Sequence, residues 1–206
     1  MEVLELLEYH PAAWREAIRH PFLDAVREGA LPAGAFEAWL AQDYLFVADL
    51  LIFQSRLLVR APRPDQAVLA SGLVGLEAEL GWFEEKAGER GLELGAPRHP
   101  TTSEYRGFLI GLEAEPYAVG ITGLWALERA YLEAWRSAAP GHPEYQEFVE
   151  HWTTPEFAEY VAGLERATGS ALASGEGERA EAAFLEVARL EKKFWEVAWS
   201  ATRPGR

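Results

Sequence analysis

The sequence of 206 residues contains no cysteine. Disulfides, zinc–thiolate sites, iron–sulfur clusters and a cysteine nucleophile are therefore all excluded. Basic residues are scarce as well: 19 Lys and Arg stand against 33 Asp and Glu, and the formal net charge is −14. This charge argues against nucleic acid as a partner, because phosphate contacts need clustered Lys and Arg.

Long apolar runs are also missing, since no stretch approaches the roughly 20 residues that a membrane-spanning helix needs. The first residues, Met1–Glu8, are acidic and lack the basic start of a signal peptide. We therefore expect a cytoplasmic protein with no membrane partner. The sequence has no glycine-rich phosphate loop after a strand pattern, and the run from Gly88 to Gly95 is better interpreted as a helix stop.

No useful length of apolar alternation with period two is present, so we predict an all-α protein. Hydrophobic residues make up 49% of the chain, enough for one domain over residues 1–206 with a sizeable core. Proline and glycine separate the helical patterns, and the short connections between them favour a compact bundle. Thr101 or Ser103 is the expected cap of the sixth helix. The first five helices are expected over 1–9, from after Pro11 to 18, and over 21–29, 35–60 and 66–90, the last with Glu77 beside its apolar stripe. The sixth runs from its cap to 112, and the seventh contains Glu128, follows Pro116 and Gly120 and ends before Pro140. The remaining helices are expected over 143–151, 155–169 and 179–199.

An acid lies among aromatic residues in the pattern around Glu128. Trp125, Leu132 and Trp135 share a helix face with this glutamate, at offsets of three, four and seven residues. Helix geometry therefore directs one carboxylate toward the core. Burying it costs free energy unless the carboxylate is paired, hydrogen-bonded or neutralised.

Two further helical patterns carry an acid in the same way. Asp43 lies on one apolar stripe and Glu191 on another. The first stripe contains Phe36, Trp39, Leu40, Phe46, Val47 and Leu50, and the second contains Phe184, Val187, Ala188, Phe194, Trp195 and Ala198. Any one of these three acids could simply lie at the edge of its apolar stripe and pair with an arginine. Three such acids on separate helices favour a shared polar pocket.

Aromatic side chains flank these acids or could reach them. They are Tyr44, Phe46, Tyr105, Tyr131, Trp152 and Phe194. Aromatic walls can stack on a flat ring, while a carboxylate binds a ring nitrogen and an exocyclic amine. A second acid, its pKa raised by burial, can move a proton to a leaving amine or activate water. The pattern is typical of cleavage or hydrolysis of a small heterocycle without a cofactor.

The five histidines give little support for a metal site. Four of them, His10, His20, His99 and His142, each precede a proline and are interpreted as helix-start residues, and His151 precedes Trp152. None stands in the Glu-x-x-His spacing of di-iron bundles. We expect no metal, and haem ligation by His20 stays an unsupported alternative.

Several segments resemble the TenA (thiaminase II) family, whose members have the haem-oxygenase-like all-α fold. The resemblance covers most of the chain. It is carried by His20–Leu23, Leu31–Pro32, Phe36–Phe46 with its Gln-Asp-Tyr-Leu-Phe run, Tyr105–Leu109, Tyr145–Phe157 and the run from Leu190 to Ala198.

The resemblance implies roles for individual residues. Asp43 would bind an aminopyrimidine, and Glu191 would bind substrate and transfer protons. The pocket wall would include Tyr105, Phe194, Phe46 where tyrosine is commoner, and Trp152 where tyrosine is often found.

The chain departs from the better-known branch of the family at its nucleophile. By spacing from Tyr105, the position of the usual Pro-Cys pair falls at or near Glu128, as in the TenA-E branch. Thiolate attack on thiamin is then not expected. The resemblance implies cofactor-free hydrolysis of thiamin breakdown products in thiamin salvage, either removal of ammonia from aminomethyl-aminopyrimidine or deformylation of its N-formyl derivative.

We therefore predict Glu128 and Glu191 as the acid/base pair and Asp43 as the anchor, with Tyr44, Phe46, Tyr105, Tyr131, Trp152 and Phe194 shaping the pocket. A non-catalytic pyrimidine-binding or regulatory protein is the alternative, and oxidation on the same fold lacks the histidine supply. The family resemblance also implies a homo-oligomer, either a dimer or a tetramer.

Overall fold

The computed structural model describes residues 2–173 and 175–201, apart from the side chains at positions 198, 200 and 201. Ala198 of the predicted last stripe therefore has its side chain outside the described residues. The helices are α1 (Glu5–Tyr9), α2 (Pro11–Ile18), α3 (Pro21–Glu28), α4 (Ala35–Arg60), α5 (Gln66–Arg90), α6 (Pro100–Leu112), α7 (Tyr117–Ala138), α8 (Gln146–His151), α9 (Pro155–Leu172) and α10 (Gly177–Ala201). The described part contains no strand, which confirms the all-α prediction.

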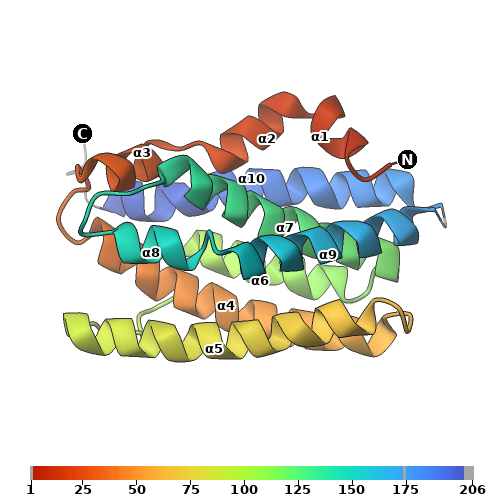
Figure 1. The fold of residues 1–206 in the computed structure, drawn as a ribbon, viewed down its shortest axis with the longest axis horizontal. Helices are drawn as coiled ribbons and strands as arrows, with labels where there is room; N and C mark the ends of the chain where they lie inside the picture. Colours follow the sequence, from red (N-terminus) through yellow and green to blue (C-terminus); the bar gives the residue numbers. More distant parts are fainter. Residues whose placement is uncertain (1, 174, 202–206) are drawn as a thin grey trace.

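Helix α7 is the centre of the bundle. It packs against α9 and α10, and α10 in turn contacts α2 and α4. Figure 1 shows α5 along one edge beside α4, while the short helices α1 to α3 cross the opposite side. Sixteen residues of α7 are buried, among them Glu128. Both faces of the helix are therefore covered, and its acid lies inside the bundle.

In two of the histidine–proline pairs, the histidine side chain caps the helix that follows, α3 or α6, which the sequence pattern did not specify. Nδ1 of His20 accepts a hydrogen bond from the backbone N–H of Phe22 at 3.1 Å. Nδ1 of His99 accepts one from the N–H of Thr101, also at 3.1 Å. His99 is thus the cap of α6, and the prediction of Thr101 or Ser103 is wrong because α6 begins earlier, at Pro100. Since Nε2 of His20 lies 3.2 Å from Glu196, both of its ring nitrogens are engaged.

Two glycines lie inside α7, although the sequence pattern placed Gly120 ahead of this helix. A Cβ at Gly123 would lie 2.7 Å from Cδ1 of Leu112, and one at Gly120 would lie 2.9 Å from Cδ1 of Leu57. These glycines allow α4 and α6 to approach α7 closely, so their role is packing and not helix termination. Residues 143–145 likewise precede α8 instead of belonging to it.

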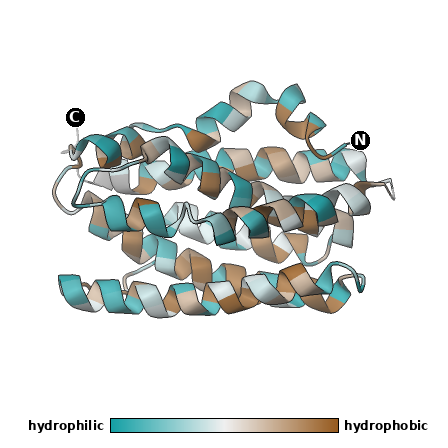
Figure 2. Cartoon of the chain, in the orientation of Figure 1, coloured by the Kyte–Doolittle hydropathy of each residue, from teal (hydrophilic) through white to brown (hydrophobic). Residues whose placement is uncertain are grey.

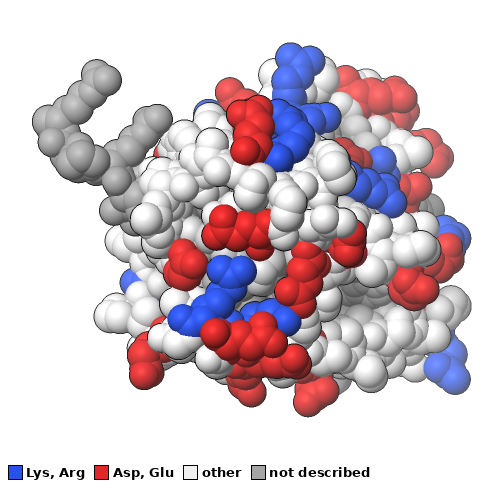
Figure 3. Space-filling model, turned by 60° about the vertical axis from the view of Figure 1, so that its left-hand side comes forward, with Lys and Arg blue, Asp and Glu red and all other residues white. Residues whose placement is uncertain are grey.

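Aromatic side chains fill the core on the inner sides of α4, α7, α8 and α10. The Trp39 and Trp135 rings lie 5.2 Å apart, and Trp135 lies 4.4 Å from Trp152. Figure 2 shows the brown, apolar faces of the long helices alternating with hydrophilic positions. On the face in Figure 3, Lys and Arg are interspersed with Asp and Glu, without a continuous basic patch. No helix in the described ranges is long and apolar enough to cross a membrane.

Candidate active site

A cavity of about 450 Å³ opens between α4, α5, α7 and the α8–α9 segment. Its walls are mainly apolar and aromatic, as in many small-molecule sites. The polar and titratable residues on its walls are Asp43, Ser71, Glu79, Glu128, Tyr131, His151, Thr154, Glu156 and Tyr160. No lysine or arginine is among the described residues that line it.

Asp43, on α4, is completely buried and lies on the cavity wall. Its Oδ2 accepts a 2.7 Å hydrogen bond from the hydroxyl of Tyr131 on α7. Its Oδ1 has no hydrogen-bond partner among the described residues. Burial raises the pKa of this carboxyl well above the usual value, although the hydrogen bond from Tyr131 opposes the shift. One oxygen of a buried carboxyl on the cavity wall therefore lacks the hydrogen bond that buried polar atoms usually make.

Glu128 lies on the same cavity, with 5% of its surface exposed. Burial raises its pKa to about 8, and the nearby charges of Glu79 and Glu191 act in the same direction. The carboxyl is therefore mostly protonated at neutral pH, which suits a group that donates a proton.

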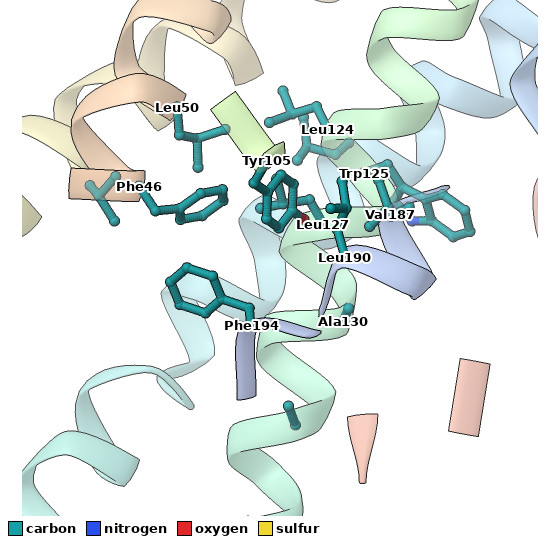
Figure 4. Packing of buried hydrophobic residues seen from close by; sticks show 14 of the residues in the cluster. Phe46, Leu50, Tyr105, Leu124, Trp125, Leu127, Ala130, Val187, Leu190 and Phe194 are labelled. Atoms are coloured by element: carbon teal, nitrogen blue, oxygen red, sulfur yellow. The ribbon is translucent and has the colours of Figure 1, made fainter. Parts of the chain in front are cut away.

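Glu191, on α10, is buried but is not among the described residues that line the cavity. Its Oε1 accepts a 2.5 Å hydrogen bond from the Tyr105 hydroxyl. Burial raises the pKa of Glu191 to about 7, while the hydrogen bond lowers it. The Phe46 ring lies 4.6 Å from that of Tyr105 and 5.5 Å from that of Phe194, and the three rings are seen together in Figure 4. Tyrosine hydroxyls therefore pair with two of the three predicted acids, Asp43 and Glu191. The alternative in which an acid pairs with an arginine does not apply to these two.

Of the predicted pocket residues, Asp43, Phe46, Glu128, Tyr131 and Trp152 line the cavity itself. Three others, Tyr105, Glu191 and Phe194, form the layer behind Phe46. Tyr44 belongs to neither group. Its hydroxyl donates to Glu84 on α5 at 3.0 Å, near the surface. Successive residues on a helix point about 100° apart, and here Tyr44 points toward Glu84 on α5 while Asp43 faces the cavity.

Glu79 and His151 also lie on the cavity wall, although neither was predicted as a site residue. Glu77, which was expected beside the apolar stripe of α5, is exposed. Glu79 follows the buried Leu76 by three residues and precedes the buried Phe83 by four. The same spacing rule that identified Asp43 therefore indicates Glu79 as well. Within residues 2–173 and 175–201, no three His, Asp or Glu side chains are grouped so that they could hold a metal ion.

A model of the TENA/THI-4/PQQC family matches residues 8–201. A Glycine max protein named "Probable bifunctional TENA-E protein" is 31% identical over 93% of this chain and 90% of its own length. A Halalkalibacterium halodurans protein named "Aminopyrimidine aminohydrolase" is 26% identical over 95% of this chain and 94% of its own.

Solved structures agree with these sequence matches. A TenA homologue from Pyrococcus furiosus superposes with a TM-score of 0.91 at 33% identity, over 96% of this chain and all (100%) of the other. A second TenA homologue, from P. horikoshii, has a TM-score of 0.88 at 21% identity, over 97% of this chain and 99% of the other, and this likeness concerns the fold alone. Sequence and fold thus agree over nearly the whole length, and the chain belongs to the TENA/THI-4/PQQC family.

Proposed function

We propose that the protein is a cofactor-free hydrolase of aminopyrimidine breakdown products of thiamin. The observation that carries this proposal is the buried carboxyl of Asp43 on the same cavity as Glu128, because its Oδ1 has no partner in the described part of the chain. A carboxyl with a free oxygen can pair with a ring nitrogen and an adjacent exocyclic amine, which an aminopyrimidine presents side by side. The names of the Glycine max and Halalkalibacterium halodurans relatives support the same reaction class.

The walls of the cavity suit a flat ring bound at Asp43. Phe46, Tyr131 and Trp152 provide aromatic surface around the carboxyl, and the Tyr131 and Trp152 rings lie 5.6 Å apart. Stacking on such faces adds affinity without selecting a particular ring substituent. Orientation therefore comes from Asp43, while the aromatic residues exclude water from the ring faces.

The two glutamates can share the proton transfers. Glu128, with a pKa raised to about 8, holds a proton near neutral pH. Glu191, with a pKa of about 7, is partly ionised there. In the proposed reaction the ionised Glu191, which is not on the described cavity wall, takes a proton from the attacking water through one intervening water. The oxygen of the attacking water bonds to the methylene carbon, and the C–N bond breaks with its electron pair on nitrogen. Glu128, which is protonated, keeps a proton on the departing nitrogen, so that this nitrogen leaves as ammonia.

Two broader expectations accompany this proposal. A homo-oligomer is supported by exposed large apolar side chains, including Val59 at 85% and Val74 at 71% exposure. A cytoplasmic location stays a prediction from the sequence.

A substrate panel tests the proposal. Purified protein is incubated with thiamin, aminomethyl-aminopyrimidine and the N-formyl derivative, and products are followed by mass spectrometry. The proposal expects product from at least one breakdown compound, at a rate well above that from thiamin. Absence of turnover, together with thermal stabilisation by hydroxymethylpyrimidine, would overturn it in favour of a non-catalytic binding protein. Rapid thiamin cleavage would show that the lost cysteine has been replaced as a nucleophile.

A further inference from the structure

Glu79 is held more firmly than any other described acid on the cavity wall. Its Oε1 accepts a 2.5 Å hydrogen bond from Nε1 of Trp152, and its Oε2 lies 2.7 Å from Nε2 of His151. The His151 ring is stacked on Trp82, with centroids 3.8 Å apart and an interplanar angle of 3°. Because a carboxylate only accepts hydrogen bonds, Nε2 of His151 must carry the proton. Two N–H groups on rigid rings therefore fix the position of this carboxylate.

The fixed carboxylate still has capacity for a ligand. An ionised carboxylate offers about four lone-pair sites, and Trp152 and His151 use two of them. The side chain of Glu79 is 17% exposed and lines the cavity. Its charge also acts on both Asp43 and Glu128, which places it near the anchor and near the proposed acid. A cationic group bound at these two residues would therefore lie within reach of Glu79.

We propose that Glu79 binds the ammonium group of the substrate and selects a primary amine over an uncharged N-acyl substrate. This inference rests on the proposed function and names the substrate class of the same site. A primary aminomethyl group is protonated near neutral pH, and a charge-assisted hydrogen bond to a carboxylate is about twice as strong as a neutral one. An N-formyl group carries no such charge and cannot make this contact.

The chemistry of the two candidate reactions points the same way. Hydrolysis of an amide develops negative charge on its carbonyl oxygen, which needs preorganised donors or cations. The described cavity wall offers four carboxyl groups and no lysine or arginine. Among the donors on that described wall, the His151 imidazole is bonded to Glu79, and the Tyr131 and Tyr160 hydroxyls are bonded to Asp43 and Gln54. The groups left to donate, the protonated Glu128 and the Thr154 hydroxyl, are neutral and not cationic. By contrast, a protonated amine is positive when it binds, and a nearby carboxylate stabilises it in the bound state.

Binding measurements test this charge preference directly. Calorimetry would compare aminomethyl-aminopyrimidine with hydroxymethylpyrimidine, an uncharged ligand of similar shape, on wild-type protein, Glu79→Gln and Glu77→Gln. Glu77 lies two residues away on α5 and is exposed, so it controls for loss of one charge from that helix. We expect the wild type and Glu77→Gln to prefer the amine, and Glu79→Gln to lose about tenfold or more of that preference. Unchanged binding of hydroxymethylpyrimidine would show that Glu79→Gln is folded.

Turnover separates this inference from the proposed function. We expect wild-type kcat/KM to be higher for the amine than for the N-formyl compound, and Glu79→Gln to lower only the value for the amine. An amine/alcohol affinity ratio that Glu79→Gln leaves unchanged would overturn the inference, even if hydrolysis is observed. Absence of hydrolysis, with an affinity ratio that Glu79→Gln still lowers, would overturn the proposed function and leave the role of Glu79 in binding standing.

Discussion

The hydroxyl of Tyr105 on α6 donates a 2.5 Å hydrogen bond to Oε1 of Glu191 on α10. Both side chains are buried, with 1% and 3% of their surfaces exposed. Burial favours the neutral form of the glutamate, whereas the donated hydrogen bond favours the ionised form. The balance leaves the pKa of Glu191 at about 7, so the group changes charge near neutral pH.

Replacing Tyr105 by phenylalanine removes this bond and should raise the pKa of Glu191 further. The rate of hydrolysis is expected to rise with pH as Glu191 ionises, and then to fall as Glu128 loses its proton near pH 8. In Tyr105→Phe the rising limb should move to higher pH, and the rate at pH 7 should drop about tenfold. A kcat–pH profile measures both effects. If the rising limb keeps its wild-type position, Glu191 is not the group that titrates there.

Asp43 should make stability depend on pH in a defined direction. Burial holds its folded-state pKa well above the usual value for an aspartate, so ionisation is less favourable in the folded than in the unfolded chain. The contribution of Asp43 to the free energy of unfolding therefore falls as pH rises above about 4. Asp43→Asn lacks this loss, so its free energy of unfolding should rise relative to that of the wild type as pH increases from 4 to 8. Urea unfolding at both pH values checks this, and an equal difference at the two would contradict it.

A pair of tyrosines tests the placement of the pocket. Tyr131 donates to Asp43 inside the cavity, whereas Tyr44 donates to Glu84 near the surface. Tyr131→Phe should weaken binding of hydroxymethylpyrimidine about tenfold, because Asp43 loses its orienting partner. Tyr44→Phe should change binding by less than about twofold. Similar losses in the two variants, measured by calorimetry, would place Tyr44 in the site after all.

Two glycines on α5 line the cavity and should respond oppositely to alanine. A Cβ at Gly72 would lie 2.2 Å from Nε2 of Gln54 and 2.4 Å from the Tyr160 hydroxyl, whereas a Cβ at Gly75 would meet nothing within 4 Å. Gly72→Ala must push apart the bonded Gln54–Tyr160 pair and should cost about 1–3 kcal/mol. Gly75→Ala should be neutral or gain up to about 1 kcal/mol from helix propensity. Thermal unfolding distinguishes them, and equal melting temperatures would contradict the close approach of Tyr160 to α5.

The order of the helices could be predicted from the sequence, because the positions of proline and glycine and the spacing of apolar residues determine helix ends and helix faces locally. The spacing also indicated that Asp43, Glu128 and Glu191 face inward, and all three are buried. Finer features failed for identifiable reasons. Gly120 was interpreted as a breaker, although the close approach of Leu57 explains it.

The partners of the buried acids could not be predicted. Tyr105 and Glu191 are 86 positions apart, and Tyr131 and Asp43 are 88 apart, so their contacts depend on how the helices pack. Glu79 is different, because its spacing from Leu76 and Phe83 was visible in the sequence. Tyr44 was grouped with Asp43 by proximity in sequence, although its hydroxyl contacts Glu84 on α5 instead of lining the cavity.

The most direct test of the account is the rate of Glu128→Gln on its best aminopyrimidine substrate. Glutamine keeps the size of the side chain but cannot exchange the proton, so kcat should fall at least about 100-fold while hydroxymethylpyrimidine still binds. The exposed Glu85→Gln serves as the matched control and should keep the wild-type rate. A Glu128→Gln enzyme that retains the wild-type kcat would contradict the assignment of Glu128 as the proton donor of the proposed reaction.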